Sequence, residues 1–213
     1  MTTSPSAAAA PPDTPPPITT SQSVDFMALL QDSLHRRMRT MHSLYYQAVD
    51  TMDLEHVNHF ERDGVLPIAF SLFHYTNMQD ATFMLLAGVA PIWNHEWQSR
   101  VRMAINDHGK ERTVAEMIHQ RIGDYDAFKE YQRAVFDRTE AHIAAMDPHE
   151  FTRVLVPPPY PPQVASTYSA RCAGPPGITV LDGFECWHYQ HGLRHMGEIE
   201  LARGLVGLGG MTS

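Results

Sequence analysis

The strongest constraint on the fold is a series of residues near the C-terminus that are spaced as on the buried face of a helix. Phe184, His188, His191, His195, Ile199, Ala202 and Val206 follow one another at intervals of three or four residues. Residues with this spacing lie on one face of a helix, the face that packs into a core. We therefore expect a helix over residues 182–206, with Asp182 as its N-cap and Glu185 completing the cap.

Three of these inward positions are histidines, and burying their polar rings in a core costs free energy unless the ring nitrogens find partners. Burying one polar group without a partner costs roughly 2–7 kcal/mol. His191 and His195 are four residues apart, so their Cβ atoms lie about 5–6 Å from each other on a helix. A shared metal ion is one solution, and ordinary hydrogen-bonded packing of the imidazoles is the alternative.

Three further segments have helical periodicity: residues 24–50, a segment that begins near Val65 and continues to Leu85, and residues 124–146. His74 interrupts the apolar face of the second, whereas we expect His35 and His42 to be solvated or at the boundary of the first. A short helix begins at Thr113, and no strand pattern is convincing. The pattern predicts an all-α fold, a four-helix bundle with a long crossover connection after residue 146.

Composition and charge limit the classes of function. The chain has 213 residues and 24 acidic against 16 basic side chains, a net charge of −8 that disfavours nucleic-acid binding. No apolar run reaches the roughly 20 residues needed to span a membrane, and the N-terminus has no secretory pattern. We expect a cytoplasmic protein with Cys172 and Cys186 reduced.

The chain divides into a tail and one domain. Residues 1–22 are almost entirely Thr, Ser, Ala and Pro, a composition that cannot form a core. We expect a disordered tail there, with a proline-rich docking segment as the alternative. The bundle then occupies residues 23–208, and residues 209–213 form a flexible C-terminus.

Three stretches resemble the DinB-like superfamily of bacterial metalloenzymes, over about residues 24–208. Gly64–His74 is similar to the family's apolar helix that ends in a ligand histidine, and Ala90–Trp93 to its tryptophan-bearing loop. His191–Ile199 is similar to the family's His-x-x-x-His motif, which Gly and Gln or Glu follow closely.

The resemblance implies a four-helix bundle that binds one divalent metal through His74, His191 and His195. Three neutral imidazoles leave coordination positions open, as catalytic sites require, and suit zinc, nickel, iron or copper. Characterised relatives are thiol S-transferases and isomerases that use a low-molecular-weight thiol. The resemblance thus implies a metal-dependent enzyme that transfers such a thiol to a small-molecule electrophile, and it favours a homodimer. The alternative is a non-catalytic metal- or ligand-binding stress or sensor protein.

Further predictions concern the residues around the metal. His188 falls outside the ligand triplet, and we consider it as a substitute ligand, as a hydrogen-bond partner of a ligand, or as a catalytic base in the pocket. We expect His188 or Tyr189 to line the open face of the metal, together with one or both of Trp93 and Trp97. Glu198 and Asp80 lie near the motifs and are candidate acceptors for the second ring nitrogens of the ligand imidazoles.

Overall fold

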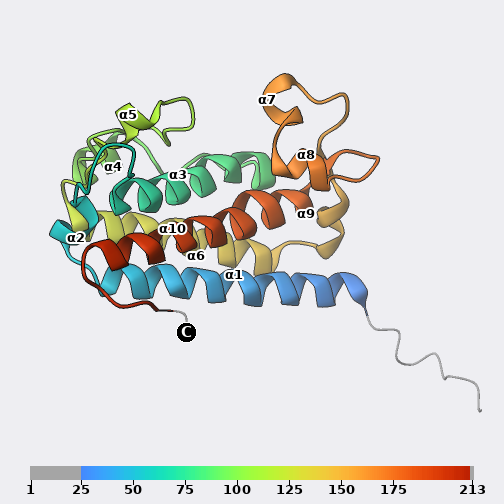
Figure 1. Cartoon of the computed structure of the whole chain (residues 1–213). Coiled ribbons are helices and arrows are strands. Elements are labelled where there is room, and N and C mark those ends of the chain that lie inside the picture. Colours follow the sequence, from blue (N-terminus) through green and yellow to red (C-terminus); the bar gives the residue numbers. More distant parts are fainter. Residues whose placement is uncertain (1–24, 212–213) are drawn as a thin grey trace, which may run out of the picture.

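The protein is mainly helical in the computed structural model, which describes residues 25–211 (Figure 1). The long helices are α1 (Phe26–Asp50), α3 (Ile68–Ala87) and α6 (Tyr125–Ala145), together with a C-terminal helix in three parts. Those parts are α9 (Val180–Asp182), η3 (Gly183–Gln190) and α10 (His191–Leu205). The predicted all-α class is confirmed, and the tail over residues 1–22 lies outside the described residues.

Short elements fill the connections between the long helices. They are α2 (Leu54–Asn58), α4 (His95–Val101), α5 (Val114–Met117), η2 (Pro148–Thr152), β1 (Val154–Val156), α7 (Pro162–Ala165), α8 (Tyr168–Cys172) and β2 (Ile178–Thr179). In residues 25–211, no helix is both long and apolar enough to cross a membrane.

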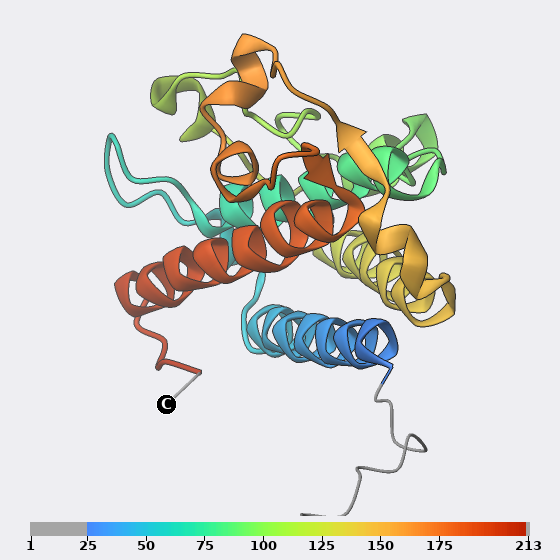
Figure 2. The ribbon, with the colours of Figure 1, turned by 90° about the vertical axis from the view of Figure 1, so that its right-hand side faces the viewer.

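The long helices form a closed bundle. Helix α10 packs against α3 and α1, and α6 packs against the other sides of the same two helices (Figure 2). The core between them is dominated by aromatic, Leu and Met side chains, with Tyr45, Tyr75, Phe128 and Phe136 fully buried. The long connections on either side of α6 carry α4, α5, α7 and α8 to the upper side of the bundle in Figure 1.

The C-terminal helix begins earlier than predicted and is not regular. Thr179 is the N-cap, and the Asp182 carboxylate accepts the Thr179 N–H at 2.8 Å, so the expectation that Asp182 is the N-cap was wrong. The following segment, Gly183–Gln190, is π-helical. Its hydrogen bonds run from residue i to i+5 and widen each turn, a local feature often found at functional sites.

His42 is completely buried, contrary to the expectation of a solvated or boundary residue. Its ring stacks on Phe136 with centroids 3.9 Å apart. Its Nδ1 lies 2.6 Å from a Glu140 carboxylate oxygen, and its Nε2 contacts the Gln79 amide. Helices α3 and α6 thus supply the polar partners that burial requires.

Asp80 fixes the connection that follows α3. Its buried carboxylate accepts the backbone N–H groups of Ile92 at 2.8 Å and Trp93 at 2.7 Å. It also accepts the Tyr131 hydroxyl at 3.0 Å and pairs with Arg138 at 2.5 Å. The prediction that Asp80 orients a metal ligand was wrong, because these four donors occupy the carboxylate.

A two-stranded antiparallel sheet, β1 with β2, was not predicted. Its strands have three and two residues, too short for an alternating pattern to show. Gly177 precedes β2 with φ of +117°, and a Cβ there would overlap the Val156 carbonyl oxygen. The sheet ties the start of the C-terminal helix to the early part of the long connection that follows α6.

Close packing of α10 against α1 and α3 yields a stability prediction. A Cβ at Gly192 would overlap Met41 Sδ and lie 2.7 Å from the Tyr75 hydroxyl oxygen. We expect Gly192→Ala to lower the free energy of unfolding by about 1–3 kcal/mol in denaturant titration, because buried overpacking is destabilising.

Gly197 on the same helix is the matched control, since nothing lies within 4 Å of a Cβ there. Gly197→Ala should raise the free energy of unfolding by up to about 1 kcal/mol through helix propensity. Equal effects of the two substitutions would contradict the close contact of α10 with α1 and α3.

Candidate metal centre

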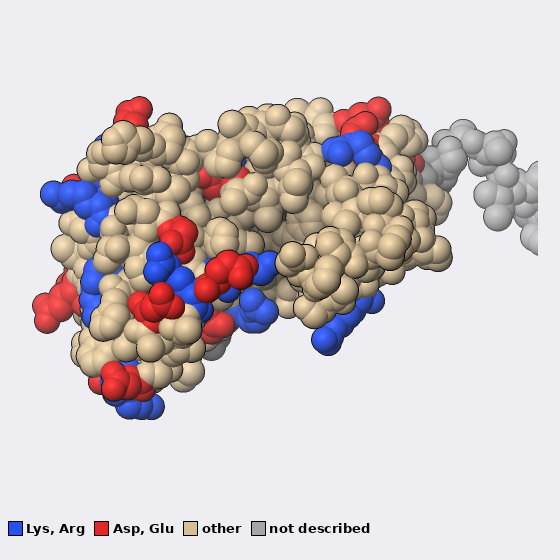
Figure 3. Space-filling view, turned by 90° about the horizontal axis from the view of Figure 1, so that it is seen from above, with Lys and Arg blue, Asp and Glu red and all other residues tan. Residues whose placement is uncertain are grey.

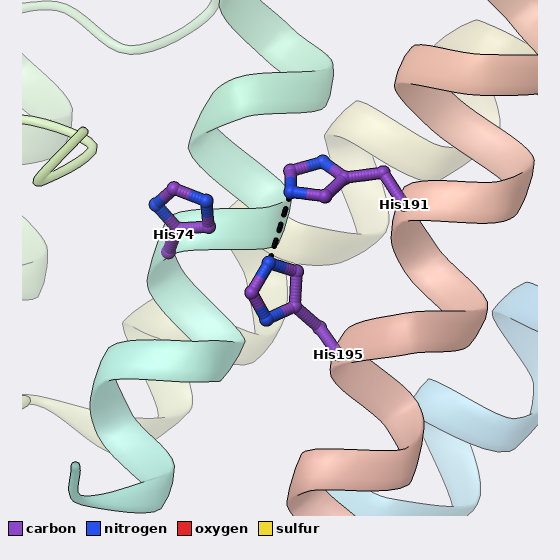
Figure 4. Close-up of side chains that lie close together, drawn as sticks. All are labelled: His74, His191 and His195. Atoms are coloured by element: carbon purple, nitrogen blue, oxygen red, sulfur yellow. Dashed lines mark hydrogen bonds between the residues drawn. The ribbon is translucent and has the colours of Figure 1, made fainter. Parts of the chain in front are cut away.

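His74 from α3 and His191 and His195 from α10 face one another inside the bundle (Figure 4). One ring nitrogen of each lies within 4.8 Å of the others. The ring centroids are 5.3 Å apart for His74 and His191, 4.8 Å for His74 and His195, and 4.6 Å for His191 and His195. The structure therefore brings together the three predicted ligands from segments more than a hundred residues apart.

Glu198 holds the ring of His195. The Nδ1 of His195 lies 2.6 Å from a Glu198 carboxylate oxygen, which also accepts the Ser71 hydroxyl at 3.2 Å. A carboxylate accepts hydrogen bonds, so Nδ1 carries a proton and the neutral ring has its lone pair on Nε2. His195 itself is only 4 % exposed. Glu198 therefore has the orienting role that the sequence suggested for it.

His74 is held by a backbone carbonyl. Its Nδ1 donates to the carbonyl oxygen of His108, a group that can only accept. The neighbouring Gly109 has φ of +78°, and a Cβ there would lie 2.8 Å from the Phe70 ring. Only a residue without a side chain lets this loop approach α3 so closely. The lone pair of neutral His74 is thus on Nε2.

The geometry fits a metal ion. The Nε2 atoms of His191 and His195 are 2.9 Å apart. Two nitrogens bound at about 2.1 Å and at right angles around one ion are about 3.0 Å apart. Metal-bound histidines characteristically donate their other ring N–H to a carboxylate or carbonyl, as His195 and His74 do. The donor set therefore suits a divalent ion with open coordination positions.

The lowered pKa values of two of these histidines keep one nitrogen of each ring unprotonated and available to a metal ion. Burial lowers the pKa of His74 to about 4 and that of His191 to about 2, with the neighbouring imidazoles and Arg194 adding to the effect. Both rings are therefore neutral at neutral pH, the form that binds metals. The hydrogen bond with His195 lowers the pKa of Glu198, so this group is a carboxylate.

A cavity of about 470 Å³ opens beside His191. It lies between α3, the C-terminal helix and the α7–α8 segment, on the hollowed face shown in Figure 3. Its lining includes Met78, Leu85, Trp187 and Tyr168 as apolar walls and hydroxyl or amide groups around them. The volume is that of a small-molecule site.

The cavity walls differ from those expected. Tyr189 lies on the other side of the helix, under Arg37 at 4.9 Å, in a groove on α1. Trp93 and Trp97 pack on Tyr131, where Asp80 holds their loop. None of these three lines the cavity beside His191, because the π-helical turn and the Asp80 contacts direct them elsewhere. Trp187 and Tyr168 line this cavity.

His188 lies behind the cavity wall and is fully buried. Its Nε2 is 3.0 Å from the hydroxyl of Thr82, which lines the cavity, and its Nδ1 has no hydrogen-bond partner among residues 25–211. Burial lowers the pKa of His188 to about 3, with the charges of His42 and Arg138 contributing. His188 is therefore a neutral ring outside the cluster of three, connected to the cavity through Thr82.

Sequence reasoning did not single out His108, Lys110, Trp187 or Arg194. His108 acts through its backbone carbonyl, which no side-chain pattern reveals. Trp187 and Arg194 are next to the histidine motif, so the motif itself was a signal for them. Lys110 comes to the cavity on the same loop as His108.

Comparisons with known proteins support the fold. No protein-family model matches the chain, and no curated protein matches it. The chain is similar to the crystal structure of a conserved protein from Enterococcus faecalis, with a TM-score of 0.60 and 13% identity over 87% of this chain and 98% of that one. At this identity the likeness concerns the fold alone. Fold and site together define an all-α protein with a three-histidine group that could hold a metal ion.

The site predicts metal content. We expect one divalent ion per chain, and we expect His74→Ala, His191→Ala and His195→Ala each to reduce it severely in elemental analysis of protein purified without a histidine tag. Glu198→Gln should weaken metal affinity about 10–100-fold, because the ring of His195 loses its anionic partner.

His56→Ala and His59→Ala are the controls, since these histidines cap α2 or pair with Glu61 away from the cluster. Full metal occupancy in a His191→Ala, His195→Ala double variant would overturn the assignment.

Proposed function

We propose that the protein is a metal-dependent enzyme of the DinB-like kind, in which His74, His191 and His195 hold one divalent ion. The observation that carries this proposal is the convergence of three imidazoles, two of them anchored through Nδ1, next to a cavity. The likeness of Gly64–His74 and His191–Ile199 to that family's motifs supports it.

The reaction that best suits this arrangement is transfer of a low-molecular-weight thiol to an electrophile. A bound divalent ion would lower the pKa of a coordinated thiol and stabilise the thiolate, the nucleophilic form. Three neutral histidines supply no negative charge, so they would leave the charge of a divalent ion available to bind an anionic ligand. Trp187, Tyr168 and Met78 would hold the apolar part of the electrophile beside His191.

Metal-dependent turnover tests this function. We expect the protein loaded with Zn²⁺, Ni²⁺ or Fe²⁺ to consume glutathione, cysteine or a related thiol in the presence of 1-chloro-2,4-dinitrobenzene or monochlorobimane. The rate should fall at least about tenfold in His195→Ala, which lacks a metal ligand. If the metal binds but no thiol and electrophile pair turns over, the alternative of a non-catalytic binding protein is favoured.

His188 is proposed as a positioning residue for Thr82 at the cavity wall. Because its ring lies outside the cluster, His188→Ala should retain the metal in elemental analysis. The turnover number should fall several-fold, and Thr82→Val should cause a similar fall, because both changes remove the same 3.0 Å hydrogen bond.

Metal loss in His188→Ala would make His188 a ligand. Turnover that is unchanged in His188→Ala, or that falls in only one of the two variants, would contradict the connection through Thr82. The homodimer remains a prediction from the resemblance.

A further inference from the structure

The cavity beside His191 carries two positive side chains and no negative one. Lys110 and Arg194 are its charged lining residues, and the rest of its lining is apolar or neutral and polar. Within residues 25–211, neither Lys110 nor Arg194 forms an ion pair. Most other cations of the protein are paired, so these two have charge available for a ligand.

Both cations are placed by the elements that build the metal site. Arg194 lies on α10 between His191 and His195. Lys110 follows His108 and Gly109, the residues that anchor His74, and its N–H donates to the His108 imidazole at 3.1 Å. An ion pair between Arg112 and Asp107, at 2.6 Å, joins the residues on either side of Lys110. The loop that carries Lys110 is therefore held in place by contacts at both ends.

The sum of the charges around the cavity favours a ligand that carries a negative charge. Three neutral imidazoles do not compensate a divalent ion, and Glu198 contributes one negative charge through its contact with His195. Arg194 and Lys110 add two positive charges at the cavity. A ligand with a negative group would balance this field, and guanidinium binds carboxylate with two parallel hydrogen bonds.

We propose that this cavity binds ligands with a carboxylate on an apolar body, and that Arg194 and Lys110 recognise the carboxylate. Trp187, Tyr168 and Leu85 contact the apolar body. This deepens the proposed function, since the same cavity would hold the electrophile. The proposal rests on the proposed function only for the charge of the bound ion, because Arg194 and Lys110 belong to the chain itself.

Calorimetric titration with two matched probes tests this proposal. The full chain, loaded with Zn²⁺, is titrated with 2-naphthoate and with its neutral isostere 2-naphthamide at low salt. Wild type should bind naphthoate about tenfold more tightly than naphthamide, a preference that weakens as salt screens the cations. An Arg194→Gln, Lys110→Gln double variant should bind both probes equally while retaining its metal.

Arg171→Gln is the matched control, because Arg171 is exposed on α8, next to the cavity but outside its lining. This variant should keep the preference for naphthoate. Equal binding of the probes by wild type, or a preference that persists in the double variant, would overturn the proposal.

The same titration of His195→Ala separates this proposal from the metal-dependent function. A preference that persists in His195→Ala but disappears in the double variant supports recognition by Arg194 and Lys110, whatever the fate of the metal. A preference that disappears in His195→Ala but persists in the double variant assigns the carboxylate to the ion, which overturns the recognition proposal and supports the metal site.

Discussion

The structure depends on the burial of three imidazoles between α3 and α10. Most buried polar nitrogens in proteins have a hydrogen-bond partner, because leaving one without a partner costs free energy. Glu198 provides one for His195 and the His108 carbonyl provides one for His74. The remaining nitrogens converge within 4.8 Å of one another, and a single cation would satisfy them together. These three imidazoles and their acceptors are thus arranged around one point.

The loops outside the bundle are fixed in ways that serve this cluster. Asp80 clamps the start of the connection after α3 through the N–H groups of Ile92 and Trp93. Gly109 lets the later part of that connection approach Phe70, which brings the His108 carbonyl to His74. Helical packing therefore positions the ligand side chains. Glu198 on the same helix orients His195, and the connection after α3 orients His74.

The sequence predicted the structural features that depend on side-chain periodicity. Helical spacing identified the long helices and showed that several histidines occupy inward positions, because both follow from which residue types face a core. The set of His74, His191 and His195 came from the resemblance to the DinB-like superfamily. The burial of His42 could not be predicted, since its partners Glu140 and Gln79 come from other helices.

The residues that line the cavity could not be predicted from the sequence for a related reason. The expectation for Tyr189 assumed a regular helix, whereas the π-helical turn presents Trp187 to the cavity. The orienting carbonyl of His108 is backbone, and Lys110 reaches the cavity through the loop that this carbonyl anchors. Such features arise from tertiary contacts and leave no local pattern.

Anomalous diffraction from crystals grown with Zn²⁺ would show whether one ion lies among these three imidazoles. We expect a strong peak at the zinc edge about 2.0–2.2 Å from a nitrogen of His74, His191 and His195. We also expect the His195 ring to keep its contact with Glu198. A peak bound to other residues, or no peak among these imidazoles, would refute a metal site at these three histidines.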